Sequence, residues 1–552
     1  MIKKSKKKLS NKIDVNRSKF FLTVLIISIL LFSIMGNVTS VNLVNRNDIN
    51  LRYNYCIKNP IGDPKGVNPG RVVWVWNPDA TEKNLTGYWW YSENNNQTII
   101  NQMFSKGLKK LTDAKDDEEA WSKLFRYFNR IHGNGDQGYQ NGEKIAIKVN
   151  LANNKYDSYE NEDNEFDANP YVVKALLGQL VNKAGVPEED ITIFDASTLM
   201  QDWFYNLVAS DFPNVYYADL KGEAEGREKV ISSETRVYFA WGRCKYRTLP
   251  KCVTEADYII NMPLLKRHPI KNGITLSGKN FFGCFMEEVS PLHRYMQWGS
   301  IMGHPAPQTD LLGHKDLGLK TLLLVGDGTF ATRKNIKDIG KFQMYPFDDD
   351  WTNSLFFSQD SVALDSVMYD FLRVEGTHPS KGSHNYLHQA ANPPSNVYDP
   401  ENDGVFLSES LGVHEHCDKY IDIFSSQRYS GPDKNGIDYI PLGEEYASFS
   451  VDILKPMRKT LTISGNMIKP LRKYNTTVIV GKIKVRAQVN CVQNSIDRVE
   501  FYLNDVLKNT DYDEPYEWLW NKPSFMKLST LEVKAYGDNS CVIDEINVWK
   551  LF

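Results

Sequence analysis

The chain has 552 residues, of which 41% are hydrophobic and 24% are charged, and this length exceeds that of one ordinary domain. The composition excludes a wholly disordered chain, because enough apolar side chains are present to build a core. A net charge of −3 excludes a strongly basic protein of the kind that binds nucleic acid, so we expect no nucleic-acid partner.

The amino-terminal segment is first basic and then apolar. Residues 1–19 carry eight Lys or Arg against one acidic residue, and residues 20–35 carry no charge. Small and polar residues follow at 38–40, and this order predicts a signal peptide or membrane anchor within 1–40. The apolar run is shorter than the about 20 residues that span a membrane, which favours cleavage over a retained anchor. Either outcome exports the rest of the chain to the envelope or the extracellular space.

Strand and helix patterns alternate along the first part of the chain. A strand at 72–76 and a helix at 112–128, with Thr112 as its N-cap, come first. The alternation predicts an α/β domain at 50–448, with its core at 143–373, built on a mainly parallel sheet with flanking helices. The strands expected in that core are 144–151, 191–195, 215–220, 258–262, 321–325 and 354–357, and its helices are 170–185 and 360–373.

The last part of the chain has the pattern of an all-β domain. Short strands are expected at 478–489, 499–502, 531–536 and 543–548, with turns between them. We therefore predict a β-sandwich at 465–552. The basic segment 455–472 is expected to be a linker followed by the first strand.

Seven cysteines are scattered without a CxxC cluster, so we expect no iron–sulfur cluster and no zinc ribbon. Export permits disulfides, and Cys244 with Cys252 and Cys491 with Cys541 are candidate pairs. The odd count leaves at least one thiol free.

The densest group of polar donors lies in residues 256–283. Lys266 and His268 follow the strand at 258–262, and Lys279 and Asn280 come shortly after. These donors could bind an anionic group such as carboxylate or phosphate, and a solvated basic loop is the equal alternative. The neighbouring cations favour a neutral His268, which suits a general base.

Further polar residues stand at the ends of other predicted elements. Lys148 and Asn150 end one strand and Asp195 ends the next, whereas Asp327 lies in a Gly-Asp-Gly turn and Asp365 lies near a helix start. Because carboxyl ends of parallel strands line the ligand crevice, these residues could orient a ligand or a cation. Capping, turn-forming and solvated roles are the alternatives.

Nine of the ten histidines lie between positions 268 and 416. His384 and His388 are four residues apart, so on a helix they would face the same way and could share a divalent metal. His414 and His416 could chelate from a strand or loop. An ordinary histidine in the core or at the surface is the more common outcome, because no HExxH or similar motif adds further ligands.

Several of these motifs resemble those of one family. Residues 266–268 (KRH), Thr275 and 279–283 (KNFFG) look like the K-x-H…T…K-N-x-F-G signature of the domain of unknown function 362 family. Many members carry a ferredoxin-like cluster insert, which this chain lacks. In the same order along 143–373, the segments 148–151 (KVNL), 195–197 (DAS), 326–328 (GDG) and 360–365 (DSVALD) are similar to other motifs of that family.

A second resemblance concerns the C-terminal segment. Residues 496–505 (IDRVEFYLND) look like the I-x-x-V-E-F-Y-x-D/N-G strand and hairpin of bacterial and archaeal Ig-like domains, with Asp505 where Gly is usual. Such domains are mostly spacers or adhesive modules, so we expect contact with the envelope and no catalysis there.

Together the patterns predict an exported enzyme or cofactor-binding protein whose cofactor is unknown. Lys266, His268 and Lys279 would hold a small anionic ligand, and His268 would move a proton. No GxSxG, GxxxxGK[ST] or GxGxxG motif occurs, so serine acyl transfer and P-loop hydrolysis have no support. The alternatives are a non-catalytic envelope protein that binds glycan or a protein partner through its aromatic residues, and a purely structural surface protein.

Overall fold

The computed structural model describes residues 59–551, except 153–157, 269–273, 334–336, 377–381, 420, 444, 446–449, 472–475, 491–495, 524–527 and 538–539. The predicted signal or anchor at 1–40 lies outside the described residues, as does Cys491. Within them, no helix combines the length and the apolar composition that crossing a bilayer requires.

A nine-stranded sheet forms the centre of the α/β part, in the order β13-β1-β12-β11-β8-β2-β3-β4-β5. All neighbours pair in parallel except β12, which is antiparallel to both β1 and β11. The predicted mainly parallel sheet is thus confirmed. The strands are β1 (Arg71–Trp76), β2 (Ile145–Lys148), β3 (Ile191–Phe194), β4 (Tyr216–Asp219), β5 (Arg227–Lys229), β8 (Tyr258–Asn261), β11 (Thr321–Gly328), β12 (Ser354–Ser358) and β13 (Asp438–Leu442).

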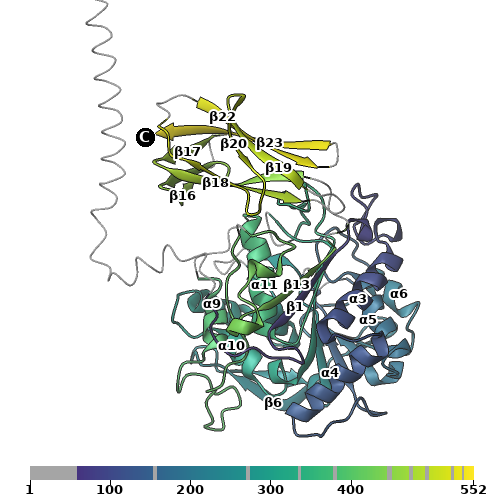
Figure 1. Ribbon diagram of the computed structural model, residues 1–552. Helices are drawn as coiled ribbons and strands as arrows, with labels where there is room; N and C mark the ends of the chain where they lie inside the picture. Colours follow the sequence, from purple (N-terminus) through teal and green to yellow (C-terminus); the bar gives the residue numbers. More distant parts are fainter. Residues whose placement is uncertain are drawn as a thin grey trace, which may run out of the picture. The chain divides into compact units, whose positions relative to one another are not determined.

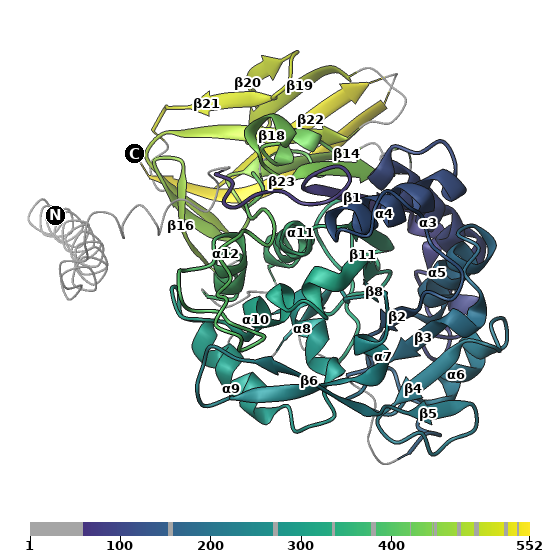
Figure 2. The same cartoon turned by 90° about the horizontal axis from the view of Figure 1, so that it is seen from below.

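Helices cover both faces of this sheet (Figures 1 and 2). Side chains alternate along β1, so Val73 and Val75 join one hydrophobic core while Trp74 and Trp76 join the other. The first core is completed by α3 (Gln97–Thr112), α4 (Asp117–Ile131), α5 (Pro170–Asn182) and α6 (Asp202–Ala209). The second contains residues of α9 (Ser290–Gly299), α10 (Pro307–Gly313), α11 (Ser361–Val374) and α12 (Asn385–Ala391).

Smaller elements fill the connections. The α/β part includes the hairpin β6 (Ser232–Tyr238) with β7 (Tyr246–Pro250), the helix α7 (Lys251–Thr254), the two-residue strands β9 (Lys266–Arg267) and β10 (Ile274–Thr275), and the helix α8 (Ser277–Asn280). Short 3₁₀ helices are η1 (Pro78–Ala80), η2 (Ser92–Asn94), η3 (Glu188–Asp190), η4 (Phe281–Cys284), η5 (Gly318–Lys320), η6 (Ser426–Arg428) and η7 (Pro432–Lys434).

Helix boundaries follow the residues that can cap them. Asn169 and Asp360 accept hydrogen bonds from the first turns of α5 and α11, where helices were predicted. The prediction of Thr112 as an N-cap is wrong, because Thr112 is the last residue of α3. The next helix, α4, is capped instead by Asp116, whose side chain accepts from the Glu119 N–H at 2.8 Å.

The C-terminal region is all-β, as predicted, and its two sheets share one core. The hairpin turn between β19 and β20 has positive φ at Asn504 and Asp505, which is the backbone that a two-residue hairpin turn requires. One sheet contains β14 (Ser450–Lys455), β18 (Ile483–Asn490) and β21 (Glu517–Trp520). The other contains β15 (Thr460–Ile463), β16 (Asn466–Pro470), β17 (Thr477–Val480), β19 (Ile496–Leu503), β20 (Val506–Asp511), β22 (Leu528–Gly537) and β23 (Ser540–Leu551).

The predicted pairing of Cys244 with Cys252 is wrong, because both thiols are free. The extended strand β7 lies between them, and at about 3.3 Å per residue it separates their backbones well beyond the about 7 Å that a disulfide tolerates. Cys541 is also free, so the predicted bond from it to Cys491 does not form.

Candidate functional site

The strand order of the sheet changes direction between β2 and β8. From β2 the chain adds β3, β4 and β5 on one side, and it later adds β8 and β11 on the other. The strands β3, β2, β8 and β11 are mutually parallel, so their carboxyl ends lie at one edge. Ligand crevices of such sheets open at this kind of switch point.

Lys148 and Asp195, at the ends of β2 and β3, form a buried ion pair. Lys148 Nζ lies 3.0 Å from Asp195 Oδ2, and each side chain is at most 2% exposed. The carboxylate also accepts hydrogen bonds from the Leu151 N–H and from the Ser197 N–H and hydroxyl. A buried pair is tolerated only when its remaining polar atoms are satisfied in this way.

Lys266, on β9, is completely buried. Its ammonium donates to the Phe166 carbonyl at 2.6 Å and lies 3.9 Å from Asp167 Oδ1. Burial lowers the pKa of Lys266 to about 8, against the opposing effect of Asp167.

Lys279, on α8, lacks such a partner. Its ammonium lies over the Phe282 ring, 4.7 Å from the centroid, and it makes no hydrogen bond or ion pair with another described residue. Burial, together with the charges of Lys266 and Lys148, lowers the pKa of Lys279 to about 7. The mutual effect of these charges indicates that the three lysines share one region.

His268 lies in the same region. Burial, together with Lys279, His293 and Lys266, holds the pKa of His268 far below its usual value, so the ring is neutral. The ring stacks on that of His293, with 5.5 Å between centroids. His293, on α9, was not among the predicted site residues.

The two predicted asparagines have different environments. Asn280 Nδ2 donates to the carbonyls of Lys148 and Met262 and to Asn261 Oδ1, so it joins the ends of β2 and β8. Its buried Oδ1 accepts no hydrogen bond in the described structure. Asn150 Oδ1 accepts from the Ala152 N–H at 3.3 Å.

Asp327 and Asp365 hold backbone in place. Asp327 accepts from the Asn169 N–H and from the Thr329 N–H and hydroxyl. Asp365 accepts from the N–H groups of Ser277 and Gly278 at the start of α8, and from the Tyr386 hydroxyl. Burial raises the pKa of each carboxyl to about 6. Asp365 therefore positions the helix that carries Lys279.

The predicted metal pair, His384 and His388, is joined by His414 and His416. Five of the six pairs of these rings have centroid separations of 4.6–6.5 Å. Burial lowers the pKa of His384 and His414 well below the usual value and that of His388 to about 4. In the described part of the chain, no three His, Cys, Asp or Glu side chains already surround a metal position. The sequence had placed these histidines in two separate pairs.

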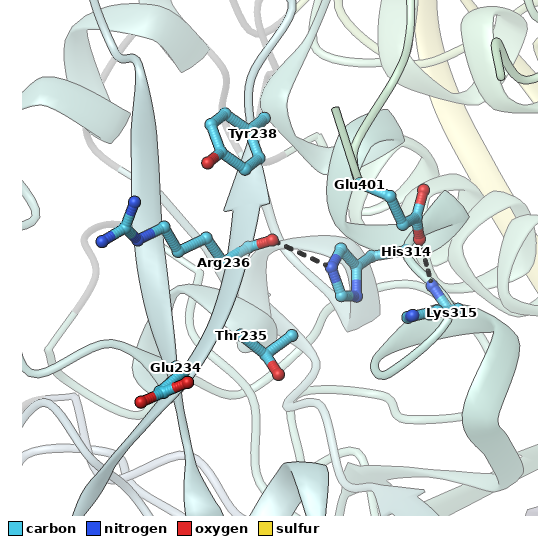
Figure 3. Close-up of a pocket in the computed structure, with 7 residues that line it drawn as sticks. All are labelled: Glu234, Thr235, Arg236, Tyr238, His314, Lys315 and Glu401. Atoms are coloured by element: carbon cyan, nitrogen blue, oxygen red, sulfur yellow. Dashed lines mark hydrogen bonds between the residues drawn. The ribbon is translucent and has the colours of Figure 1, made fainter. Parts of the chain in front are cut away.

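A cavity of about 270 Å³ lies elsewhere, lined by residues that include Arg236, Tyr238, His314 and Glu401 (Figure 3). His314 Nε2 lies 3.2 Å from the Arg236 carbonyl, and Glu401 accepts from the Lys315 N–H. None of the predicted site residues lines this cavity.

Comparisons with known proteins identify two domains by sequence. Residues 145–370 match the family model "Domain of unknown function (DUF362)", and residues 473–535 match "Bacterial Ig domain". No curated protein matches the chain.

Solved structures add only distant similarities. The fibronectin(III)-like modules of Clostridium thermocellum CbhA are 16% identical, with 21% of this chain and 52% of that chain covered and a TM-score of 0.15. The endo-beta-1,4-mannanase from Thermotoga petrophila is 11% identical, with 78% and 83% covered and a TM-score of 0.16. Such scores carry no argument about fold or function. By sequence, the chain therefore contains a region that matches DUF362, at residues 145–370, followed by a region that matches a bacterial Ig domain, at residues 473–535.

Proposed function

We propose that the protein is an exported enzyme or cofactor-binding protein that holds a small anion at its lysine site, defined as Lys148, Lys266, Lys279 and His268. The observation that carries this proposal is the ammonium of Lys279, which has no hydrogen-bond or ion-pair partner among the described residues. The other two ammonium groups each lie within 4 Å of a carboxylate, Lys148 near Asp195 and Lys266 near Asp167. One positive charge is therefore left for a ligand such as a carboxylate or phosphate.

His268 would act as the general base. A neutral imidazole beside cationic lysines can take a proton from a substrate whose anionic group the lysines hold. The low pKa of His268 supports the neutral form, and the bound anion would bring that pKa closer to neutral. Asn150 and Asn280 lie at the same sheet edge and would orient the ligand.

Export is supported by two features. Bacterial Ig domains favour an extracellular or envelope location, and residues 473–535 match one. The basic and then apolar order of residues 1–35 is that of an export signal. The Ig domain would contact the envelope while the DUF362 domain binds the ligand.

The test is calorimetric titration of residues 41–552 with inorganic phosphate and, separately, with acetate. We expect Lys279→Met to weaken binding of the preferred anion by at least about tenfold, because it removes the uncompensated charge while keeping the apolar stem. The matched control is Lys115→Met, which removes a lysine that is 80% exposed and should leave affinity unchanged. Binding that survives Lys279→Met, or a wild type that binds neither anion, would contradict the proposal.

The second candidate is a non-catalytic binding protein of the envelope. It is favoured by the exposed aromatic side chains Tyr512 and Trp549 in the Ig region, which are 65% and 43% exposed. Pull-down on cell-wall glycan separates the two candidates, since this one predicts retention that Lys279→Met leaves intact and Tyr512→Ala reduces.

A further inference from the structure

Four histidines from two parts of the chain meet beside α11. His384 immediately precedes α12 and His388 lies within it. His414 forms an isolated β-bridge with Ile61, and His416 lies two residues further on. We call His384, His388, His414 and His416 the histidine cluster. None of its members belongs to the lysine site.

The spacing of the rings matches that of imidazoles around one metal ion. A zinc–nitrogen distance of about 2.0 Å, plus about 1.1 Å from nitrogen to ring centre, places tetrahedral ring centroids about 5 Å apart. The ring centroids lie 4.6 Å apart for His388 and His414, 4.8 Å apart for His414 and His416, and 5.3 Å apart for His384 and either His388 or His416. The pair of His384 and His414 is wider, at 6.5 Å.

His414 offers a free lone pair to the cluster. The Ser366 hydroxyl donates to the Val362 carbonyl at 2.7 Å, so the Ser366 oxygen accepts from His414 Nδ1 at 2.8 Å. With the hydrogen on Nδ1, the neutral ring carries its lone pair on Nε2. His414 is 1% exposed, and its buried Nε2 makes no hydrogen bond with a described residue. An unused acceptor buried among three other imidazoles requires a partner.

Helix α11 also supplies the groups that orient His384 and His416. Asp370 Oδ1 lies 3.1 Å from His416 Nδ1, and the Tyr369 hydroxyl lies 3.3 Å from His384 Nδ1. Metal-binding histidines commonly engage such a carboxylate or oxygen through the nitrogen that does not bind the metal. Arg373 is the neighbouring cation, and it pairs with Asp370 at 3.0 Å, so its charge is offset.

We propose that the histidine cluster binds a divalent first-row transition metal, such as Zn²⁺, through ring nitrogens that include His414 Nε2. An all-imidazole set suits zinc, copper or nickel and does not suit magnesium or calcium, which prefer oxygen ligands. The donor atoms do not yet converge, so binding turns the rings about their side-chain torsions while the backbone stays in place. Ser366, Tyr369 and Asp370 are positioning residues for this site.

The experiment uses untagged residues 41–552, stripped with a chelator and titrated with Co²⁺ and then Zn²⁺. We expect one Co²⁺ per chain with the intense visible bands of a four-coordinate ion, and loss of those bands when Zn²⁺ displaces it. His388→Gln should weaken Zn²⁺ binding at least about tenfold, and Ser366→Ala should weaken it less while retaining the bands. His132→Gln, at the end of α4 and outside the cluster, is the matched control and should bind as the wild type does.

The spectrum of the wild type is decisive even where a variant fails to fold. A wild type that binds no cobalt, or that shows only the weak bands of a six-coordinate ion, overturns the proposal. Unchanged zinc affinity in folded His388→Gln and His414→Gln proteins, verified by their thermal transitions, does the same. Anion binding at the lysine site is measured separately, so failure of one site is distinguishable from failure of the other.

Discussion

The ammonium groups of three buried or partly buried lysines are stabilised in different ways. Lys148 pairs with Asp195, and Lys266 donates to a backbone carbonyl, whereas Lys279 rests on an aromatic face. A buried ammonium without a strong partner loses its proton more easily, which is why the pKa of Lys279 falls to about 7. The charge of Lys279 is therefore the property of the proposed anion site that responds most to pH near neutrality.

Anion affinity should depend on pH through Lys279. Below a pKa of about 7 the side chain is charged and attracts the anion, and above it the charge is lost, so affinity should fall as pH rises. Lys266, with a pKa of about 8, adds to the fall at higher pH. Titration with sulfate, whose charge does not change in this range, should show affinity dropping by up to about tenfold per pH unit above pH 7.

The matching control is Lys279→Met, in which the dependence between about pH 6 and pH 7.5 should largely disappear. A wild-type sulfate affinity that is the same at pH 6 and pH 9 would show that neither lysine contributes its charge.

The segment from α8 through η4 positions the residues of the lysine site through two hydrogen-bonded attachments. Asp365 accepts from the first N–H groups of α8, and the Ala196 N–H donates to the Gly283 carbonyl at 2.7 Å. These two attachments hold Lys279 and Asn280 against the ends of β2 and β8. The close approach at the second attachment requires a residue without a side chain.

Gly283→Ala should therefore damage the site. A Cβ at this position would lie 2.5 Å from Lys148 Nζ and 2.8 Å from Asp195 Oδ1, so the buried ion pair would have to separate. We expect a loss of about 1–3 kcal/mol in the free energy of unfolding, measured by urea denaturation, and weaker anion binding. Gly242→Ala, where nothing lies within 4 Å of the added Cβ, should leave stability unchanged or slightly raised. Equal stability of the two variants would contradict this account of Gly283.

At the scale of the whole molecule, three hydrophobic cores are separate. Two flank the nine-stranded sheet, and the third lies between the two C-terminal sheets and contains only residues from 451 onward. The hydrogen-bonded pairs of both C-terminal sheets also lie within 450–551. A region with its own core and complete sheets meets the requirements of an independent domain.

Residues 450–552 should consequently fold alone. We expect the isolated fragment to unfold in one cooperative thermal transition, followed by circular dichroism, and to show dispersed amide resonances. A Val533→Asp variant, which places a charge in the third core, should abolish that transition. A wild-type fragment without a cooperative transition would mean that its core needs the rest of the chain.

Much of the fold was readable from the sequence, because it depends on local patterns. The apolar run at 72–76 predicted β1, the patterns at 170–185 and 360–373 predicted two helices, and the Asn504–Asp505 turn marked a hairpin. The clustering of Lys266, His268 and Lys279 was also predicted, since these residues lie close together in sequence and follow one strand.

Only the tertiary structure decided which distant residues meet. In the tertiary structure, β12 is antiparallel to its neighbours, and Cys244 and Cys252 lie too far apart to bond. Asp365 accepts a hydrogen bond from the start of α8. The tertiary structure also joined two histidine pairs that the sequence had left separate. Local propensity acts over a few residues through backbone torsions and capping, whereas these contacts depend on how whole elements pack, which no short segment encodes.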